Sequence, residues 1–224
     1  MAFPAFMKIL LSALSLLVIS SLVAQEGAKE APAKTEWVLF DGKSLANWEA
    51  VDMGGSGEVT VEGGQMVINQ GESLSGVVYK KVEELPLTNY EITVQAKRLQ
   101  GVDFFCGLTF PIGDVKKCAT LVCGGWGGSV TGISSIDDLD AANNATGTYQ
   151  RYEDDKWYTI RLRVTPENLS VWVDEKQVVD QDIKGRKVAL RQGPIDAYAP
   201  LSLTTYNTMA AIKSVRLKVI PAAK

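Results

Sequence analysis

The chain has 224 residues, 46% of them hydrophobic, and a formal net charge of −3 from 23 Lys and Arg against 26 Asp and Glu. A mildly acidic chain without a cluster of basic residues gives no electrostatic reason to expect nucleic acid as a partner, because phosphate binding demands grouped Lys and Arg. Histidine is absent, which excludes Ser-His-Asp and Cys-His mechanisms and every metal site that contains His.

Residues 1–24 have the pattern of a secretory signal peptide. Lys8 supplies the positive charge, and an apolar run from Ile9 to Val23 follows it. This run is shorter than the roughly 20 apolar residues of a comfortable membrane span. We therefore expect a secreted or periplasmic protein, with cleavage near Ala24 and no stable membrane insertion after it.

Residues 25–34 are polar and include Gly, Ala and Pro, a composition that predicts a flexible linker because it offers little apolar surface to bury. Residues 35–224 have the size of one domain. Alternation of apolar and polar residues dominates this part, as at 90–97, 104–110 and 215–219. Many short strands separated by Gly, Pro and Asp clusters predict an all-β fold of two antiparallel sheets packed face to face.

Two hairpins can be predicted with a register. The first joins 160–164 to 169–173 and places Arg161 opposite Trp172 on its polar side. These two side chains are either a surface cation–π pair or, if this side lines the groove, ligand contacts.

The second hairpin joins 103–110 to 118–126 around Gly113 and Asp114. In the register that places Cys106 opposite Cys123, one side is apolar and faces the core. The other side is mixed and carries the candidate ligand contacts: Asp103 opposite Trp126, Phe105 opposite Gly124, and Thr109 opposite Thr120.

An aromatic ring beside a carboxylate suits a sugar, because the ring stacks on C–H groups while the carboxylate accepts hydrogen bonds from hydroxyls. We therefore predict a saccharide ligand on the concave face of a sheet, near Trp126 and Asp103. The alternative is that Trp126 packs under a loop and Asp103 only caps a turn.

Asp137, Asp138 and Asp140, followed by two asparagines, carry the oxygen ligands that Ca²⁺ or another divalent cation prefers. The spacing matches no EF-hand loop, so a solvated turn is the preferred interpretation and a cation site the alternative. The three cysteines, Cys106, Cys118 and Cys123, are an odd number. We expect buried thiols, with one disulfide as the alternative.

The stretch WVLFDGKSLANW at 37–48, followed by VEGGQM at 61–66, resembles the opening of the 3-keto-disaccharide hydrolase domain family. The strand at 89–94 and the hairpin at 157–180 resemble its later landmarks. The resemblance implies a concanavalin A-like jelly-roll sandwich, secretion, and action on or binding to sugars, with some members acting as 3-keto-glucoside hydrolases or lyases.

Ordinary glycoside hydrolysis uses two carboxyl groups, and the strand motif of jelly-roll glucanases is missing from this sequence. Asp103 and Glu91 are the candidate catalytic carboxylates, beside Asp137 and Asp138. A 3-keto sugar is less demanding, because its ketone acidifies the neighbouring C–H, and elimination needs one base and a group such as a Tyr or a bound cation that stabilises the enolate. The sequence leaves open an enzyme on 3-keto-glycosides, a noncatalytic carbohydrate-binding module and a cell-surface interaction domain.

Overall fold

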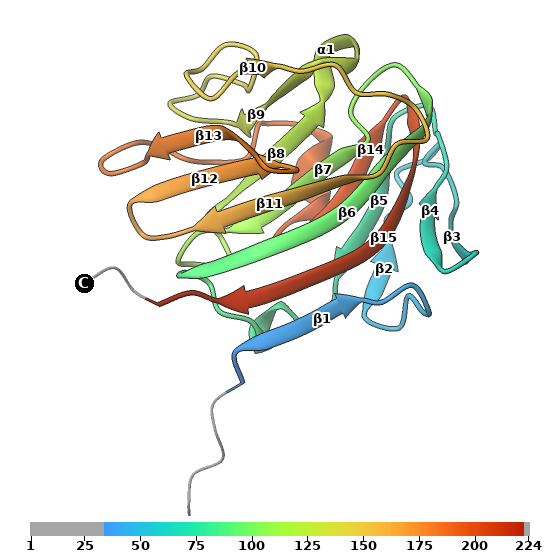
Figure 1. Ribbon diagram of the computed structural model, residues 1–224, viewed down its shortest axis with the longest axis horizontal. Coiled ribbons are helices and arrows are strands. Elements are labelled where there is room, and N and C mark those ends of the chain that lie inside the picture. The colour runs from blue at the N-terminus through green and yellow to red at the C-terminus, as the bar shows by residue number, and fades with distance from the viewer. Residues whose placement is uncertain (1–33, 222–224) are drawn as a thin grey trace, which may run out of the picture. The chain divides into compact units, whose positions relative to one another are not determined.

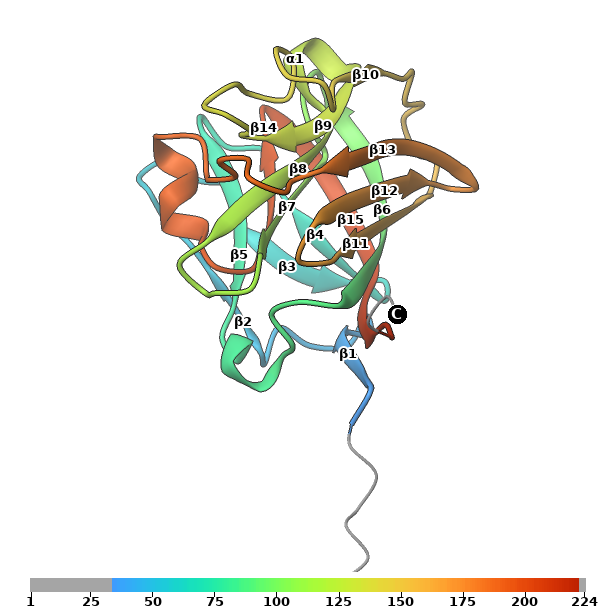
Figure 2. The same ribbon diagram turned by 90° about the vertical axis from the view of Figure 1, so that its left-hand side faces the viewer.

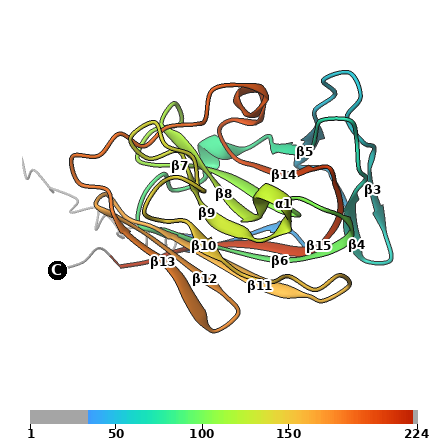
Figure 3. The same cartoon turned by 90° about the horizontal axis from the view of Figure 1, so that it is seen from above.

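The computed structural model describes residues 34–221 (Figure 1). The predicted signal peptide and nearly all of the predicted linker lie outside these residues. Within them the strands form two antiparallel sheets that pack face to face (Figure 3). The predicted all-β jelly-roll sandwich is thereby confirmed.

Sheet A contains eight strands of the described part of the chain. Their spatial order is β13 (Lys176–Asp182), β12 (Asn168–Val173), β11 (Tyr158–Val164), β6 (Tyr90–Gly101), β15 (Thr208–Val219), β4 (Gln65–Ile68) and β3 (Val59–Glu62), with β1 (Glu36–Phe40) paired to β15.

Sheet B contains seven strands of the same residues. Their order is β10 (Thr148–Tyr149), β9 (Val130–Ser134), β8 (Cys118–Gly124), β7 (Cys106–Pro111), β14 (Ser202–Tyr206), β5 (Leu74–Tyr79) and β2 (Trp48–Ala50). Three short helical turns complete the fold: η1 (Val82–Glu84), α1 (Gly125–Gly128) and η2 (Pro194–Tyr198). None of the helices in residues 34–221 has the length and apolar character needed to cross a bilayer.

The core lies between the sheets and follows the alternation of the sequence. On β6, the side chains of Tyr90, Ile92 and Val94 are fully buried, as expected for the inward face of a strand. The Tyr90 hydroxyl donates a hydrogen bond to the carbonyl of Pro111, 2.6 Å away on β7, and so links the two sheets.

The opening motif closes one part of this core. The indole N–H of Trp48 donates to the carbonyl of Leu39 at 2.8 Å, and the Trp48 ring meets Tyr79 edge to face. The two aromatic rings therefore fix β2 on the end of sheet B. All three cysteines are buried with free thiols, so the structure favours the expected thiols over the disulfide.

The chain leaves sheet A after β13 and returns in sheet B as β14. The connection, residues 183–201, is here called the crossover segment. Its η2 turn packs on β5 and β14, and Figure 2 shows it on the outside of sheet B. The Tyr198 side chain is fully buried, and its hydroxyl donates to the carbonyl of Leu74 at 3.2 Å. The crossover segment is therefore anchored on the outer face of sheet B.

Candidate functional site: a pocket on the outer face of sheet B

The outer face of sheet B carries a pocket of about 450 Å³. Thr120 and Val122 of β8 and Ser134 at the end of β9 line its floor. The loop before β7, the turn of α1 and the crossover segment form its walls. The pocket thus lies where an irregular connection covers part of a sheet.

Strand alternation explains the floor. In the β7–β8 hairpin Leu108 pairs with Leu121 and is buried in the core, while the next pair, Thr109 and Thr120, faces the other way. The predicted register, with Cys106 opposite Cys123, is confirmed over the paired strands. The Thr109 and Thr120 hydroxyls lie 3.0 Å apart and share a hydrogen bond. Thr109 itself is fully buried, so only Thr120 of this pair lines the pocket.

Asp103 and Trp126, which the sequence analysis placed opposite each other on a hairpin, both line the pocket, although Trp126 lies in the α1 turn after β8. The Asp103 carboxylate accepts a hydrogen bond from the backbone N–H of Phe104 at 2.8 Å and another from Gly127 at 3.2 Å. Asp103 therefore fixes the turn that carries the indole. Trp126 has a left-handed backbone with φ of 49°, between Gly124 at 81° and Gly127 at 84°, a conformation that glycines adopt without strain.

The aromatic rings of the pocket come from distant parts of the chain. Phe104 and Tyr206 stack with ring centroids 6.1 Å apart. The Trp126 side chain is 38% exposed, and the guanidinium carbon of Arg191 lies 6.0 Å from its ring centroid. The pocket therefore offers two flat aromatic surfaces that a ligand can contact.

Polar groups of the pocket complement these rings. Ser134 is buried, and its hydroxyl has no hydrogen-bond partner within the described residues, a state that proteins usually relieve with water or a ligand. Among the described residues that line the pocket, Asp103 is the one carboxylate, and Arg191 and Tyr206 are the other ionisable groups. The pocket therefore lacks the pair of carboxyl groups used in ordinary glycoside hydrolysis.

The prediction that Phe105 faces the ligand is wrong. The Phe105 backbone N–H bonds to the carbonyl of Cys123 at 3.2 Å, so the alternation breaks before β7 begins and two successive residues point inward. The Phe105 ring is fully buried, with its centroid 4.9 Å from that of Tyr152 and 6.0 Å from that of Tyr158. Its neighbour Phe104 lines the pocket instead.

The structure does not bring Glu91, Arg161 and Trp172 to this pocket. All three lie in sheet A on strand positions that alternate with core residues, so they face away from sheet B. The predicted register that places Arg161 opposite Trp172 is confirmed, and the Arg161 guanidinium carbon lies 3.9 Å from the indole centroid. Glu91 is 1% exposed and pairs with three cations there, which is the environment of a structural carboxylate.

The aspartates proposed as cation ligands are engaged separately. Asp137 pairs with Arg186 at 2.8 Å and Asp138 with Lys187 at 2.7 Å, while Asp140 accepts from the amide of Asn143. Within residues 34–221 no group of three or more Asp, Glu, Cys or His side chains is placed to hold a metal ion. The three carboxylates therefore have separate partners in the structure and are not gathered around one point.

Several residues of the pocket were missed by the sequence analysis. Arg191 and Ile195 belong to the crossover segment, whose sequence has no periodicity that tells which sheet face it covers. Tyr206 is the last residue of β14. It follows Thr205, which is buried, so strand alternation was the local signal for an outward-facing Tyr206 ring.

Comparison with solved structures finds sandwiches of the same fold. The Crh5 transglycosylase, solved in complex with NAG, is 14% identical with a TM-score of 0.59, over 85% of this chain and 86% of that chain. The carbohydrate-binding module CBM66 from Bacillus subtilis is 11% identical with a TM-score of 0.52, over 77% and 95%. Domain 4 of the arabinanase AbnA from Geobacillus stearothermophilus, in complex with arabinotriose, is 14% identical with a TM-score of 0.51, over 84% and 93%.

At these identities the likeness concerns the fold. No curated protein sequence matches the chain. A family model does match: that of the 3-keto-alpha-glucoside-1,2-lyase-like domain, over residues 36–218. The match spans both sheets and confirms the resemblance seen in the opening motif. The chain therefore belongs to the family of 3-keto-alpha-glucoside-1,2-lyase-like domains.

Proposed function

We propose that the protein binds a saccharide in the pocket on sheet B and cleaves 3-keto-glycosides by elimination, with Asp103 as the base. The observation that carries the proposal is the joint placement of Asp103, Trp126 and the Phe104–Tyr206 stack around one pocket of about 450 Å³. The family and the saccharide-related neighbours support the same class of ligand.

The shape and chemistry of the pocket suit a sugar ring. Aromatic surfaces pack on the C–H faces of a pyranose, while hydroxyls and charged groups fix its orientation through hydrogen bonds. Trp126 and Tyr206 are each 38% exposed and offer such surfaces. Thr120 and Ser134 line the floor between these surfaces.

A single carboxylate is sufficient for elimination from a 3-keto sugar. The ketone acidifies the proton on the adjacent carbon, and Asp103 takes that proton while the electron pair moves into the carbonyl as an enolate. The enolate then forms a C=C bond as the glycosidic C–O bond breaks. The departing oxygen recovers a proton from the Asp103 carboxyl or from water, so that protons balance. The Arg191 guanidinium lines the same pocket and is the cation available to stabilise the enolate.

The test is incubation with 3-keto-trehalose, followed by chromatography of the released sugar. We expect the wild-type protein to consume the compound, and Asp103→Asn to lose at least about a hundredfold in rate, because a general base contributes on that order. Reaction in D₂O should place deuterium on the carbon next to the ketone of recovered substrate wherever proton removal is reversible.

Asp114→Asn is the matched control, since Asp114 is exposed and caps the β7–β8 turn through the N–H of Lys116. This variant should keep the wild-type rate. A folded wild-type protein that leaves every 3-keto-glycoside intact would exclude the catalytic part of the proposal. Equal rates for Asp103→Asn and the wild type would exclude Asp103 as the base.

A noncatalytic carbohydrate-binding module is the second candidate. Both oxygens of Asp103 already accept backbone hydrogen bonds, which favours a role in shaping the pocket. A glycan array separates this candidate from a protein-interaction domain. A binding module retains glycans and loses them in Trp126→Ala, whereas an interaction domain ignores glycans and is indifferent to the change.

We also propose that the protein is exported, on the signal-peptide pattern of residues 1–24. Expression of the full chain in a Gram-negative host, followed by fractionation and N-terminal sequencing, tests this. A mature protein that begins near Gln25 in the periplasm or medium supports export, and a cytoplasmic protein with an intact Lys8 segment contradicts it.

A further inference from the structure

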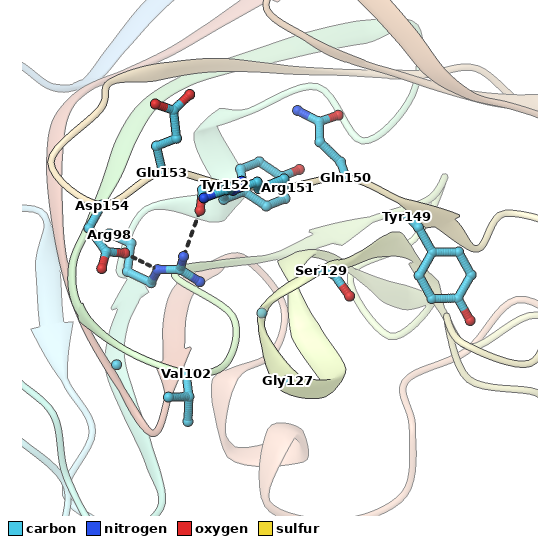
Figure 4. A pocket seen from close by; sticks show the side chains of 12 residues that line it. Arg98, Val102, Gly127, Ser129, Tyr149, Gln150, Arg151, Tyr152, Glu153 and Asp154 are labelled. Atoms are coloured by element: carbon cyan, nitrogen blue, oxygen red, sulfur yellow. Dashed lines mark hydrogen bonds and ion pairs between the residues drawn. The ribbon is translucent and has the colours of Figure 1, made fainter.

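A second, shallower cleft of about 830 Å³ adjoins the pocket. Figure 4 shows its lining, with Arg98 and Asp154 at one end and Tyr149 at the other. Ser129 and Gly127 lie between these two ends. The cleft is thus lined by the end of β6, the turn that carries Trp126, and the segment that runs from Tyr149 of β10 to Asp154.

The pocket and the cleft share their boundary. Along the loop before β7, Val102 lines the cleft and Asp103 lines the pocket. Along α1, Gly127 lines the cleft and Trp126 lines the pocket. The hydrogen bond from the Gly127 N–H to Asp103 joins these two segments. A low ridge of two adjacent loops therefore separates the two depressions.

Gly127 adds no side chain to this ridge. A β-carbon at Gly127 would have no neighbouring atom within 4 Å, so the position faces free space. The bare backbone at this point allows an elongated ligand to pass from one depression to the other in close contact with the protein.

The cleft has the surface chemistry of a carbohydrate subsite. Val102 is 69% exposed and Tyr149 78% exposed, so both side chains are accessible to a ligand in the cleft. Arg98 is nearly buried and is held by the Asp154 carboxylate and the carbonyl of Tyr152. Its guanidinium is therefore a preorganised donor.

The charges of the cleft balance. Arg98 and Arg151 are matched by Glu153 and Asp154 among the residues that line it. The lining thus carries no net charge, which is compatible with a neutral, hydroxyl-rich chain.

We propose that the ligand is an oligosaccharide that lies across both depressions, with one sugar in the pocket beside Trp126 and further sugars over Gly127 on the Tyr149 side. The proposal rests on the proposed saccharide function of the pocket and extends it from a single ring to a chain. The cleft then makes the protein prefer longer oligosaccharides, while the pocket recognises the one sugar that it holds.

The test is isothermal titration of glucose, maltose, maltotriose, maltotetraose and maltopentaose into the wild type and three variants. We expect affinity to rise with chain length. Tyr149→Ala should weaken the longer oligomers roughly threefold to tenfold, the range of one aromatic contact, and leave the shortest binding ligand unchanged. Tyr149→Phe keeps the ring and should match the wild type. Trp126→Ala should weaken every length.

The results separate the two levels of the proposal. If affinity depends on Trp126 but neither on chain length nor on Tyr149, the cleft does not bind sugars and the extended site is excluded. The saccharide function of the pocket is then still supported. Failure of every oligomer to bind the folded wild type overturns the extended oligosaccharide site, whereas the function of the pocket itself is decided separately by the turnover of 3-keto-trehalose. The extended site is also excluded if Tyr149→Ala, with a normal far-UV spectrum and melting temperature, loses affinity for oligomers of every length.

Discussion

The carboxylate of Asp103 and the backbone N–H of Gly127 are joined by a hydrogen bond of 3.2 Å. This bond holds the turn of Trp126 against the loop before β7, and it makes Asp103 both a pocket residue and a structural one.

Replacement of Asp103 should therefore change stability as well as chemistry. Asp103→Ala removes both accepted hydrogen bonds, and we expect the free energy of unfolding to fall by about 2 kcal/mol, since one such bond contributes about 1 kcal/mol. Asp103→Asn keeps one acceptor and should lose about half as much. Urea denaturation measures both values. An alanine variant as stable as the wild type would show that the two bonds contribute nothing.

The backbone at Trp126 gives a second prediction. Its φ of 49° costs an L-residue about 1 kcal/mol that glycine avoids. Trp126→Gly should therefore be about 1 kcal/mol more stable than Trp126→Ala, although both lack the indole. Thermal unfolding of the two variants measures the difference. An alanine variant at least as stable as the glycine variant would show that the left-handed turn does not persist.

The same two variants also report on the ligand. Both should lose saccharide affinity to a similar degree, because both lose the stacking surface. Trp172→Ala is the matched control, since this indole lies on sheet A and faces away from the pocket. A loss of binding in Trp172→Ala equal to that in Trp126→Ala would contradict the location of the site.

Glu91 gives a prediction about acid stability. Burial alone raises the pKa of a carboxyl, but hydrogen bonds from Lys218, Arg163 and Arg161 outweigh it, so the pKa of Glu91 is lowered. A folded-state pKa below the unfolded value means that the carboxylate stabilises the fold above that unfolded value, about 4.3. The contribution disappears as the pH falls through the folded value.

Glu91→Gln should accordingly lower the free energy of unfolding by about 2 kcal/mol at neutral pH. The deficit should shrink as the pH falls below about 4. Urea denaturation of the variant and the wild type over a pH series measures it. A difference that stays constant from neutral to acid pH would mean that the Glu91 charge does not stabilise the fold.

The cysteines should be unreactive in the native protein. Burial raises the pKa of Cys106 to about 12, and burial together with the Asp114 charge raises that of Cys118 to about 11. The thiolate is the reactive form, so a disulfide reagent such as DTNB should label these thiols slowly at neutral pH. All three should react at once in denaturant. Rapid labelling of the native wild type that Cys118→Ser abolishes would show that the β7–β8 turn opens.

Local alternation was sufficient for the central strands, such as those at 90–97 and 215–219, and for both hairpin registers. The pairs Cys106–Cys123 and Arg161–Trp172 lie on strands joined by short turns, so side-chain periodicity and turn position together fix the register. The opening motif around Trp48 added the family and, with it, the type of sandwich.

The orientation of Phe105 could not be predicted in this way. Its ring packs on Tyr152 and Tyr158, which come much later in the chain and meet it only in the folded core. These long-range contacts override the alternation of the strand that follows Phe105. Periodicity likewise shows that Arg161 and Trp172 share a face, but it contains no information on which sheet face carries the pocket.

The crossover segment is anchored at both ends, so the residues between the anchors can change without loss of the fold. Tyr198 ties one end to Leu74, and Val188 bridges to Ile136 at the other. The stretch between them, which includes Arg191, is largely exposed and contributes little to the core. A graft that exchanges residues 189–195 for those of a relative should therefore transfer the relative's sugar preference and leave the melting temperature nearly unchanged.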